Sequence, residues 1–329
     1  MNPIAVAGAV GVGVAFGYAA QRGALCMNSG FRMAFQGDWT KVKAFALAVA
    51  VQLIALPAVF GAGLAQPAHL PLLPLAAVVG GVLFGVSMPW AGGCAAGVWY
   101  KLGAGDVGAL IALLGMALGS TASESGPLAP IRRGLQEAVT PNAAVTASPL
   151  VSLLAGGLLL AALARARDGR AGAWSWRRTG LLVGLVATVA WPLSALAGRQ
   201  FGLAVMPGTT SLVSAATGIP FPAWDTLLLG GILIGGWLAA RRAGRFSLSA
   251  PAPLTLLKRF AGGMGLGLGA SIAAGCTVGQ GLTGLALLAP GSFGVMAAIF
   301  AGSGVATLAT RWAAKTSATS GPSGAATRP

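Results

Sequence analysis

Charged residues are scarce in this sequence. Asp and Glu together number 6 among 329 residues, and charged residues of both signs make up 8%. Soluble domains carry about a quarter of their residues as charged side chains, so this composition excludes an ordinary soluble protein. Hydrophobic residues reach 56% and the mean hydropathy is +0.80, which indicates a polytopic membrane protein.

Residues that bind metals are almost missing as well. The chain has one histidine, His69, and three cysteines, none of them in a CxxC pair. A metal site needs more imidazole or thiolate ligands than these, so we expect no metal and no other cofactor. The phosphate-binding pattern GxxxxGK[ST] is also missing from the sequence, which argues against ATP hydrolysis by this chain.

The charge that is present has mostly one sign, with 21 Lys and Arg giving a net charge of +15. In a soluble protein such an excess can indicate nucleic-acid binding. Here the basic residues cluster between apolar segments, at 164–178, at 241–259 and in the tail from Arg311. This pattern favours the positive-inside rule and no nucleic-acid partner. We therefore predict that the basic loops and the C-terminus are cytoplasmic and that the N-terminus is outside.

Apolar segments of membrane-spanning length recur along the whole chain. They cover residues 3–20, 42–63, 72–90, 106–121, 149–164, 179–197, 223–240, 260–275 and 292–310. We predict an all-α polytopic membrane protein with about nine transmembrane helices. Asp38 and Asp106 lie near the ends of these segments, where we expect them to pair with Lys41 and Lys101.

A glycine–cysteine motif occurs twice. AGGCAAG (Ala91–Gly97) aligns with AAGCTVG (Ala273–Gly279), and the offset is 182 residues, from Cys94 to Cys276. Both copies follow one glycine-rich apolar span and precede another. The match indicates that the chain contains an internal duplication.

A second pair of segments has nearly the same spacing. QRGALCM (Gln21–Met27) aligns loosely with RQFGLAV (Arg199–Val205), at an offset of 179 residues from position 23 to position 202. Val205 then takes the position of Cys26. Each half holds four spans, and the single span at 149–164 between them inverts the second half. The sequence thus predicts an inverted-topology repeat.

Four parts follow from this organisation. They are a first transmembrane repeat over 1–121; an outward loop, a linking transmembrane helix and a basic cytoplasmic loop over 122–178; a second, inverted repeat over 179–312; and a disordered cytoplasmic tail over 313–329.

The cysteine motifs interrupt apolar helices, which predicts short re-entrant half-helices around a transport site. A half-helix that begins near Cys94 or Cys276 directs free N–H groups at that site, which suits an anion. Thiols are soft, weak S–H donors, so several along a path favour a sulfur-bearing anion over sulfate. The candidate substrate-binding residues are Cys26, Cys94, Cys276, Gly93, Gly97, Gly275, Gly279, Arg22 and Gln280.

Other interpretations of the same residues stay open. The cysteines can be small packing residues at helix crossings in a membrane scaffold. A thiol of lowered pKa can instead be the nucleophile of a membrane sulfurtransferase that forms a persulfide. Arg22 can be a topology anchor, and Gln280 can serve packing.

Three segments carry a resemblance to a known family. RGALCMNSGFR, GGCAAGVWYKLGAG and AAGCTVGQGLTG resemble, in order, the signature segments of the YeeE/YedE family of bacterial membrane proteins of sulfur transport. The resemblance implies an hourglass of transmembrane helices with inverted pseudo-symmetry in the bacterial inner membrane. It also implies uptake of thiosulfate by a transporter rather than an enzyme.

The resemblance further implies roles for residues and partners. Cys26, Cys94 and Cys276 fall on the family's three cysteines, which are thought to pass thiosulfate along by S–H···S hydrogen bonds. Family members often work with a small cytoplasmic sulfur-carrier protein. Some are linked to selenium or other sulfur compounds, so these remain alternative substrates.

Overall fold

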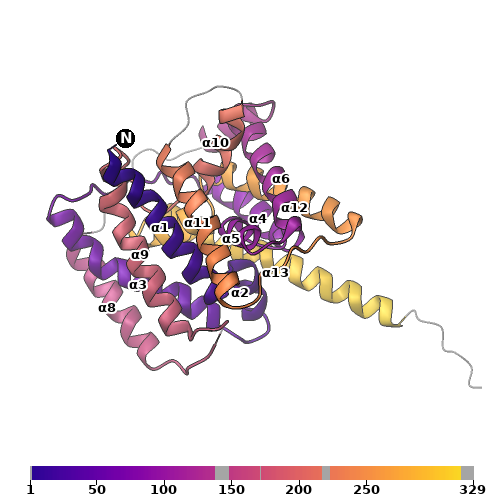
Figure 1. Cartoon of the computed structure of the whole chain (residues 1–329), viewed down its shortest axis with the longest axis horizontal. Coiled ribbons are helices and arrows are strands. Elements are labelled where there is room, and N and C mark those ends of the chain that lie inside the picture. Colours follow the sequence, from indigo (N-terminus) through magenta and orange to yellow (C-terminus); the bar gives the residue numbers. More distant parts are fainter. Residues whose placement is uncertain (1, 138–147, 171, 217–222, 320–329) are drawn as a thin grey trace, which may run out of the picture.

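The computed structural model of the chain describes residues 2–137, 148–170, 172–216 and 223–319, and every regular element within these ranges is a helix (Figure 1). The helices are α1 (Pro3–Arg22), α2 (Met27–Ala34), α3 (Thr40–Gly61), α4 (Pro74–Ala91), α5 (Ala95–Gly103), α6 (Val107–Glu124), α7 (Ala129–Glu137), α8 (Pro149–Ala164), α9 (Trp176–Ala195), α10 (Met206–Ala216), α11 (Ala223–Arg242), α12 (Pro253–Ile272), η1 (Thr277–Gly284) and α13 (Pro290–Thr319).

The helices confirm a multi-pass membrane protein. Within the described residues, 7 helical stretches are long and apolar enough to cross a membrane, and α12 with η1, bent by 42°, brings the number to 8. The predicted count of about nine also included α8, which has only 16 residues. A crossing takes about 20 residues, so α8 is short for a spanning helix.

Two parts of the chain differ from the prediction. The segment expected to be an outward loop contains a helix, α7, and its residues 138–147 lie outside the described part. The disordered tail was predicted to begin at residue 313, whereas helix α13 continues as far as Thr319. The rest of that tail, 320–329, lies outside the described residues.

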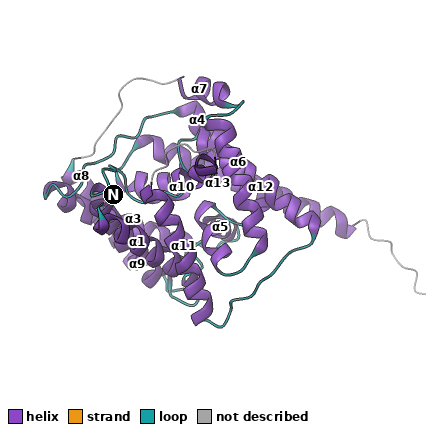
Figure 2. Ribbon diagram, turned by 45° about the horizontal axis from the view of Figure 1, so that its top comes forward, coloured by secondary structure: helices purple, strands orange, loops and turns teal. Residues whose placement is uncertain are grey.

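The helix contacts follow the proposed halves. α1 packs on α11 as α9 packs on α3, and α4 packs on α13 as α12 packs on α6. α1 also meets α9, and α4 meets α12. Figures 1 and 2 show α3, α8 and α9 on one side of the molecule and α6 and α12 on the other. At the offset of the repeat, α1, α3, α4 and α6 correspond to α9, α11, α12 and α13. Exchanging each helix for its counterpart leaves these contacts unchanged, as an inverted repeat predicts.

Several of these helices meet backbone to backbone through glycine. A methyl group at Gly13 of α1 would lie 2.9 Å from the Cα atom of Gly231 in α11. A methyl group at Gly80 of α4 would lie 2.5 Å from the backbone nitrogen of Ala273, directly after α12. Small residues at such crossings let membrane helices pack closely without large side chains between them.

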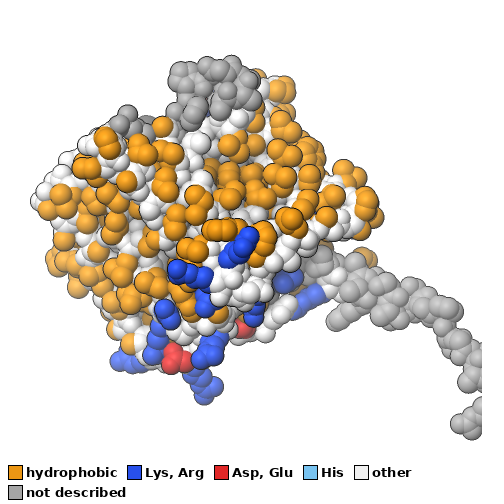
Figure 3. All heavy atoms as spheres, viewed as in Figure 1, with side chains coloured by type: hydrophobic (Ala, Val, Ile, Leu, Met, Phe, Trp, Pro, Cys, Tyr) orange, Lys and Arg blue, Asp and Glu red, His pale blue; other side chains and the backbone are white. Residues whose placement is uncertain are grey.

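Positive charge gathers at one end of the molecule. In Figure 3, Lys and Arg side chains lie along one edge, and apolar side chains cover most of the remaining visible surface. The loops 164–178 and 241–259 form this basic end, where Ala173 donates its N–H to the carbonyl of Arg22 at 2.9 Å. The second loop reaches α6, whose first N–H, from Val107, donates to Ser249 at 3.0 Å.

Candidate functional site

Each of the three cysteines follows the same kind of helix end. Two positions before each cysteine the backbone is left-handed, at Ala24 (φ +48°), Gly92 (φ +76°) and Ala274 (φ +54°). The residue directly before each cysteine donates its N–H to the carbonyl five residues back, at 2.9 Å for Leu25, 3.2 Å for Gly93 and 2.7 Å for Gly275. This is the Schellman geometry, which ends a helix and turns the chain.

The cysteines then open the next helices. Cys26, Cys94 and Cys276 each have extended backbone and are the N-cap residues of α2, α5 and η1. The first N–H groups of a helix have no partner inside it, so each break offers free donors close to a thiol. Short helices after all three cysteines are thus confirmed. Their re-entry stays a prediction, because Pro3–Ala34 also qualifies as one broken span.

Two of the thiols lie in contact. The Sγ atoms of Cys26 and Cys94 are 3.9 Å apart, and both side chains are buried. A methyl group at Gly97 would lie 2.8 Å from the Cys26 Sγ and 3.4 Å from the Cys94 Sγ. Gly97 therefore makes the space in which the two thiols meet.

The third thiol lines a cavity of about 460 Å³, here called the Cys276 cavity. Its wall includes Cys276 and Gly279 of the third break and Val205 of the segment before α10. The backbone of Gly279, Val278 and Val205 lies near the Cys276 thiol. Val205 thus neighbours Cys276 as Cys26 neighbours Cys94, in agreement with the repeat.

One guanidinium is held firmly in the wall of the Cys276 cavity. Arg199 donates to the carbonyls of Phe201 at 2.9 Å and Gly202 at 2.7 Å, and its Nη2 lies 2.9 Å from the Asp225 carboxylate. Burial lowers the pKa of Arg199 and the carboxylate beside it raises that pKa. An arginine side chain keeps its proton in proteins, so the group stays charged beside Asp225 in the cavity wall.

The remaining charges of the Cys276 cavity come from the insert around α7. Arg132 donates to the carbonyl of Ser123 at 3.0 Å and to Gln136 at 2.8 Å. Gln136 in turn donates to the carbonyl of Ile272 at 2.9 Å, at the end of α12. Arg132, Gln136 and Glu124 all line the cavity. These residues were not among the predicted site residues, although four charges between 122 and 148 in a chain with so few charges were a signal.

Known proteins are similar in sequence to this chain over most of its length. Residues 22–305 match the family described as sulphur transport. The chain belongs to this family. This match confirms the resemblance drawn from the three cysteine segments.

Two relatives are named thiosulfate transporter TsuA. The protein from Escherichia coli (strain K12) is 32% identical over 303 residues, which cover 84% of this chain and 86% of the relative. The protein from Spirochaeta thermophila is 33% identical over 313 residues, which cover 88% of this chain and 93% of the relative. The likeness therefore covers nearly the whole of each protein.

The other predicted residues of this sulphur transport protein shape the breaks. Gly275 has φ +152°, and a methyl group there would lie 2.9 Å from Gln280. The Gln280 amide donates to the carbonyl of Ala274 at 2.9 Å and accepts from Ser292 at 2.6 Å, so it braces the third break. A methyl group at Gly93 would lie 3.2 Å from the Val98 nitrogen.

Arg22 lies apart from these contacts, at the end of α1 on the basic end. Its Nε is buried and has no hydrogen-bond partner among the described residues. An unpartnered buried N–H of this kind can donate a hydrogen bond to an anion.

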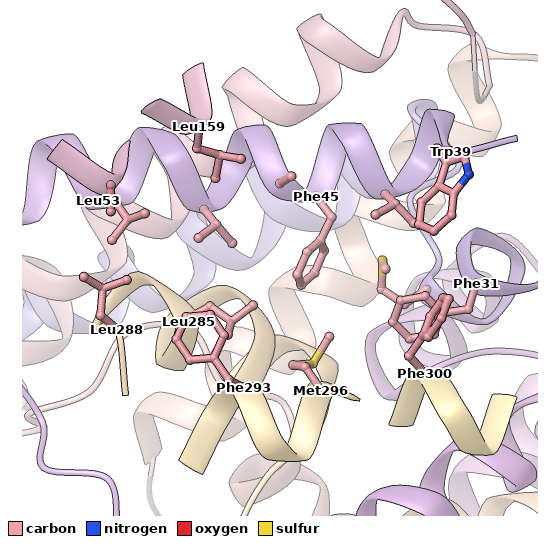
Figure 4. Close-up of a pocket in the computed structure, with 15 residues that line it drawn as sticks. Phe31, Trp39, Phe45, Leu53, Leu159, Leu285, Leu288, Phe293, Met296 and Phe300 are labelled. Atoms are coloured by element: carbon pink, nitrogen blue, oxygen red, sulfur yellow. The ribbon is translucent and has the colours of Figure 1, made fainter. Parts of the chain in front are cut away.

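A second cavity does not suit an anion. This groove of about 490 Å³ runs between α3 on one side and, on the other, α13 with Leu285 and Leu288, which precede it. Figure 4 shows Phe45 and Leu53 facing Leu285, Met296 and Phe300 across it. Its lining is apolar, and a charged ion would lose its hydration there without gaining donors. The Cys276 cavity is therefore the better candidate for an anion.

Proposed function

We propose that this protein is an inner-membrane transporter that imports thiosulfate from the periplasm to the cytoplasm along its three thiols. The observation that carries the proposal is the distribution of the thiols. One thiol lines a cavity with Arg199 and Arg132, and two touch each other nearer the basic end. Both relatives carry the name thiosulfate transporter.

The chemistry of the site suits this ion. The Cys276 cavity offers the guanidinium of Arg199 and backbone N–H groups for the oxygens of thiosulfate. Its terminal sulfur is a soft acceptor that matches S–H donors better than sulfate oxygens do. The ion then passes to the Cys26–Cys94 pair by exchange of weak hydrogen bonds, without a covalent step. Such a cycle makes the protein a carrier of the ion rather than an enzyme.

Growth and uptake test the proposal together. A bacterial strain without other sulfate and thiosulfate importers receives the wild-type chain, Cys94→Ala or Cys276→Ala, with thiosulfate as the sole sulfur source. We expect wild type to restore growth and uptake of radiolabelled thiosulfate, and both variants to lose them at equal membrane levels. Leu158→Ala, on the exposed face of α8, is the matched control. Full uptake by both cysteine variants would exclude a thiol path.

A sulfurtransferase is the alternative that uses the same thiols. Intact-mass measurement after incubation with thiosulfate separates the two functions, because a persulfide adds one sulfur atom to the protein. We expect an unchanged mass. Competition of labelled uptake by sulfite and by selenium oxyanions shows whether another ion is preferred. A small sulfur-carrier protein, if required, would raise uptake when supplied on the cytoplasmic side.

A further inference from the structure

Two lysines in this structure carry charge without an acidic partner. Within the described residues the ion pairs are Arg177 with Asp168, Arg199 with Asp225 and Arg259 with Asp106. Lys41 and Lys101 take part in none of them. The predicted pairing of Asp38 and Asp106 with these two lysines is therefore wrong.

The two aspartates are occupied elsewhere. Asp38 accepts the N–H of Thr40 at 2.9 Å, at the start of α3, and Asp106 lies 3.5 Å from Arg259. Asp106 also accepts the Ala109 N–H, as the N-cap of α6. Both carboxylates thus accept hydrogen bonds from the first turn of a helix. The spacing of residues along the sequence cannot distinguish this role from an ion pair.

The neutral partners of the lysines lie at the cysteine breaks. Lys41 is only 7% exposed and donates to the Ser29 hydroxyl at 2.6 Å. That hydroxyl donates to the carbonyl of Cys26 at 3.0 Å. Lys101 donates to the carbonyl of Gly92 at 2.5 Å, two residues before Cys94. Each ammonium is thus tied to the backbone of one break beside the thiol pair.

The groups around Lys41 include two further cations. The charged and titratable groups that act on it are Cys26, Lys101, Arg32 and Asp38. Asp38 is exposed, and the others are a thiol and two cations. A buried ammonium group needs a counter-ion to offset its lost hydration, and hydroxyl and carbonyl oxygens supply only part of this.

We infer that Lys41, Lys101 and Ser29 form a second anion site behind the Cys26–Cys94 pair. The site binds the oxygens of thiosulfate while the terminal sulfur faces the two thiols, and it rests on the proposed function. Lysine ammonium groups sit on flexible stems with three donors each, so an arriving anion can replace the neutral partners. The ion is then held at two stations, the Cys276 cavity and this site nearer the basic end.

Equilibrium binding of radiolabelled thiosulfate to the purified full chain tests the inference. We expect two ions per chain at saturation for wild type and one for the double variant Lys41→Gln/Lys101→Gln. The charge-preserving double variant Lys41→Arg/Lys101→Arg is expected to bind two. Lys43→Gln, a neighbouring lysine of α3, is the matched control and is also expected to bind two.

Each other result is informative. Two ions bound by the glutamine double variant, or one ion bound by wild type and glutamine variant alike, overturns the second site and leaves the proposed function standing. Equal losses in the glutamine and arginine variants, with wild-type elution from a sizing column, show a packing role and overturn the inference too. If the double variant does not elute as wild type, Lys101→Gln alone carries the test. No binding by wild type would instead count against the proposed function itself.

Discussion

At the scale of single residues, the contact between Cys26 and Cys94 depends on a missing side chain. Gly97 faces both sulfur atoms, and the nearer one would lie 2.8 Å from an added methyl group. A thiol can rotate away, so the helices can stay packed while the pair separates. Transport and folding therefore respond differently to a change at this position.

Gly97→Ala should lower thiosulfate uptake by roughly tenfold or more at unchanged membrane level, because the added methyl group moves the two sulfur atoms apart and misaligned groups lower a rate by at least this factor. Uptake of the labelled ion in cells measures this effect. Gly157→Ala in α8, where a methyl group meets no atom within 4 Å, serves as control. Wild-type uptake by Gly97→Ala would show that the thiol contact has no part in transport.

Ala274 gives a prediction of opposite sign. Its φ of +54° is a left-handed conformation that L-residues adopt at a cost and that glycine adopts freely. Ala274→Gly should stabilise the protein by about 0.5–1 kcal/mol, even though glycine is more flexible when unfolded. Thermal denaturation in detergent compares it with Ala273→Gly, where φ is −75° and a loss of stability is expected. Equal losses in both variants would contradict the assigned backbone strain.

The positions of the three helix breaks could be predicted from the sequence. Cysteines between glycines at a constant offset identify the breaks, because helix ends need residues of special conformation. Arg199 was not foreseen as a site residue, since its partner Asp225 is 26 positions later and only the fold brings the two to 2.9 Å. The same reason explains why Lys41 was assigned to Asp38 rather than to Ser29.

At the scale of elements, hydropathy located the long helices and missed the short polar one. The apolar run 42–63 corresponds to α3 at Thr40–Gly61, because transmembrane helices are specified by their own composition. α7 has low apolar content and is instead held by Gln136, which donates to the end of α12. Such a helix owes its place to tertiary contacts that no local pattern encodes.

The repeat predicts a position for a fourth thiol. Val205 is buried, and its backbone lies near the Cys276 thiol, as the first half brings Cys26 near Cys94. In a Cys26→Ser background, which removes the neighbouring Cys26–Cys94 thiol pair, Val205→Cys should form a disulfide with Cys276 under a mild oxidant, seen as the loss of two hydrogens in intact mass. The same substitution in that background, combined with Cys276→Ser, is the control and should leave the mass unchanged. Absence of the cross-link in the first variant would speak against equivalent breaks in the two halves.

At the scale of the whole molecule, the one-sided charge sets the expected orientation. Lys and Arg gather at the basic end in Figure 3, whereas the N-terminus lies toward the opposite end in Figure 1. Basic loops are retained on the cytoplasmic side during insertion. The ends of α1 and α4 lead to the Cys26–Cys94 pair, so we expect that pair to lie on the cytoplasmic side of the proposed path.

Reporter fusions check this orientation. A fluorescent protein fused after Pro329 should fluoresce, and alkaline phosphatase fused at the same point should be inactive, because it folds only in the periplasm. Phosphatase inserted between an added leading span and the N-terminus of this chain should be active, because it then lies on the periplasmic side. The reverse pattern would invert the direction of the proposed path and place the Cys276 cavity on the cytoplasmic side.

The glycine contacts between helices have a mechanical consequence. α1 and α11 meet at Gly13 and Gly231, and α4 meets the end of α12 at Gly80. Where two backbones are in direct contact, no side chains lie between them that could change their packing. We therefore expect each of these helix pairs to move as one rigid body. A transport cycle based on large rocking motions would need a hinge, and these helix pairs contain none. Movement is left to the three breaks themselves, and the turnover rate should then depend little on the thickness or stiffness of the surrounding bilayer.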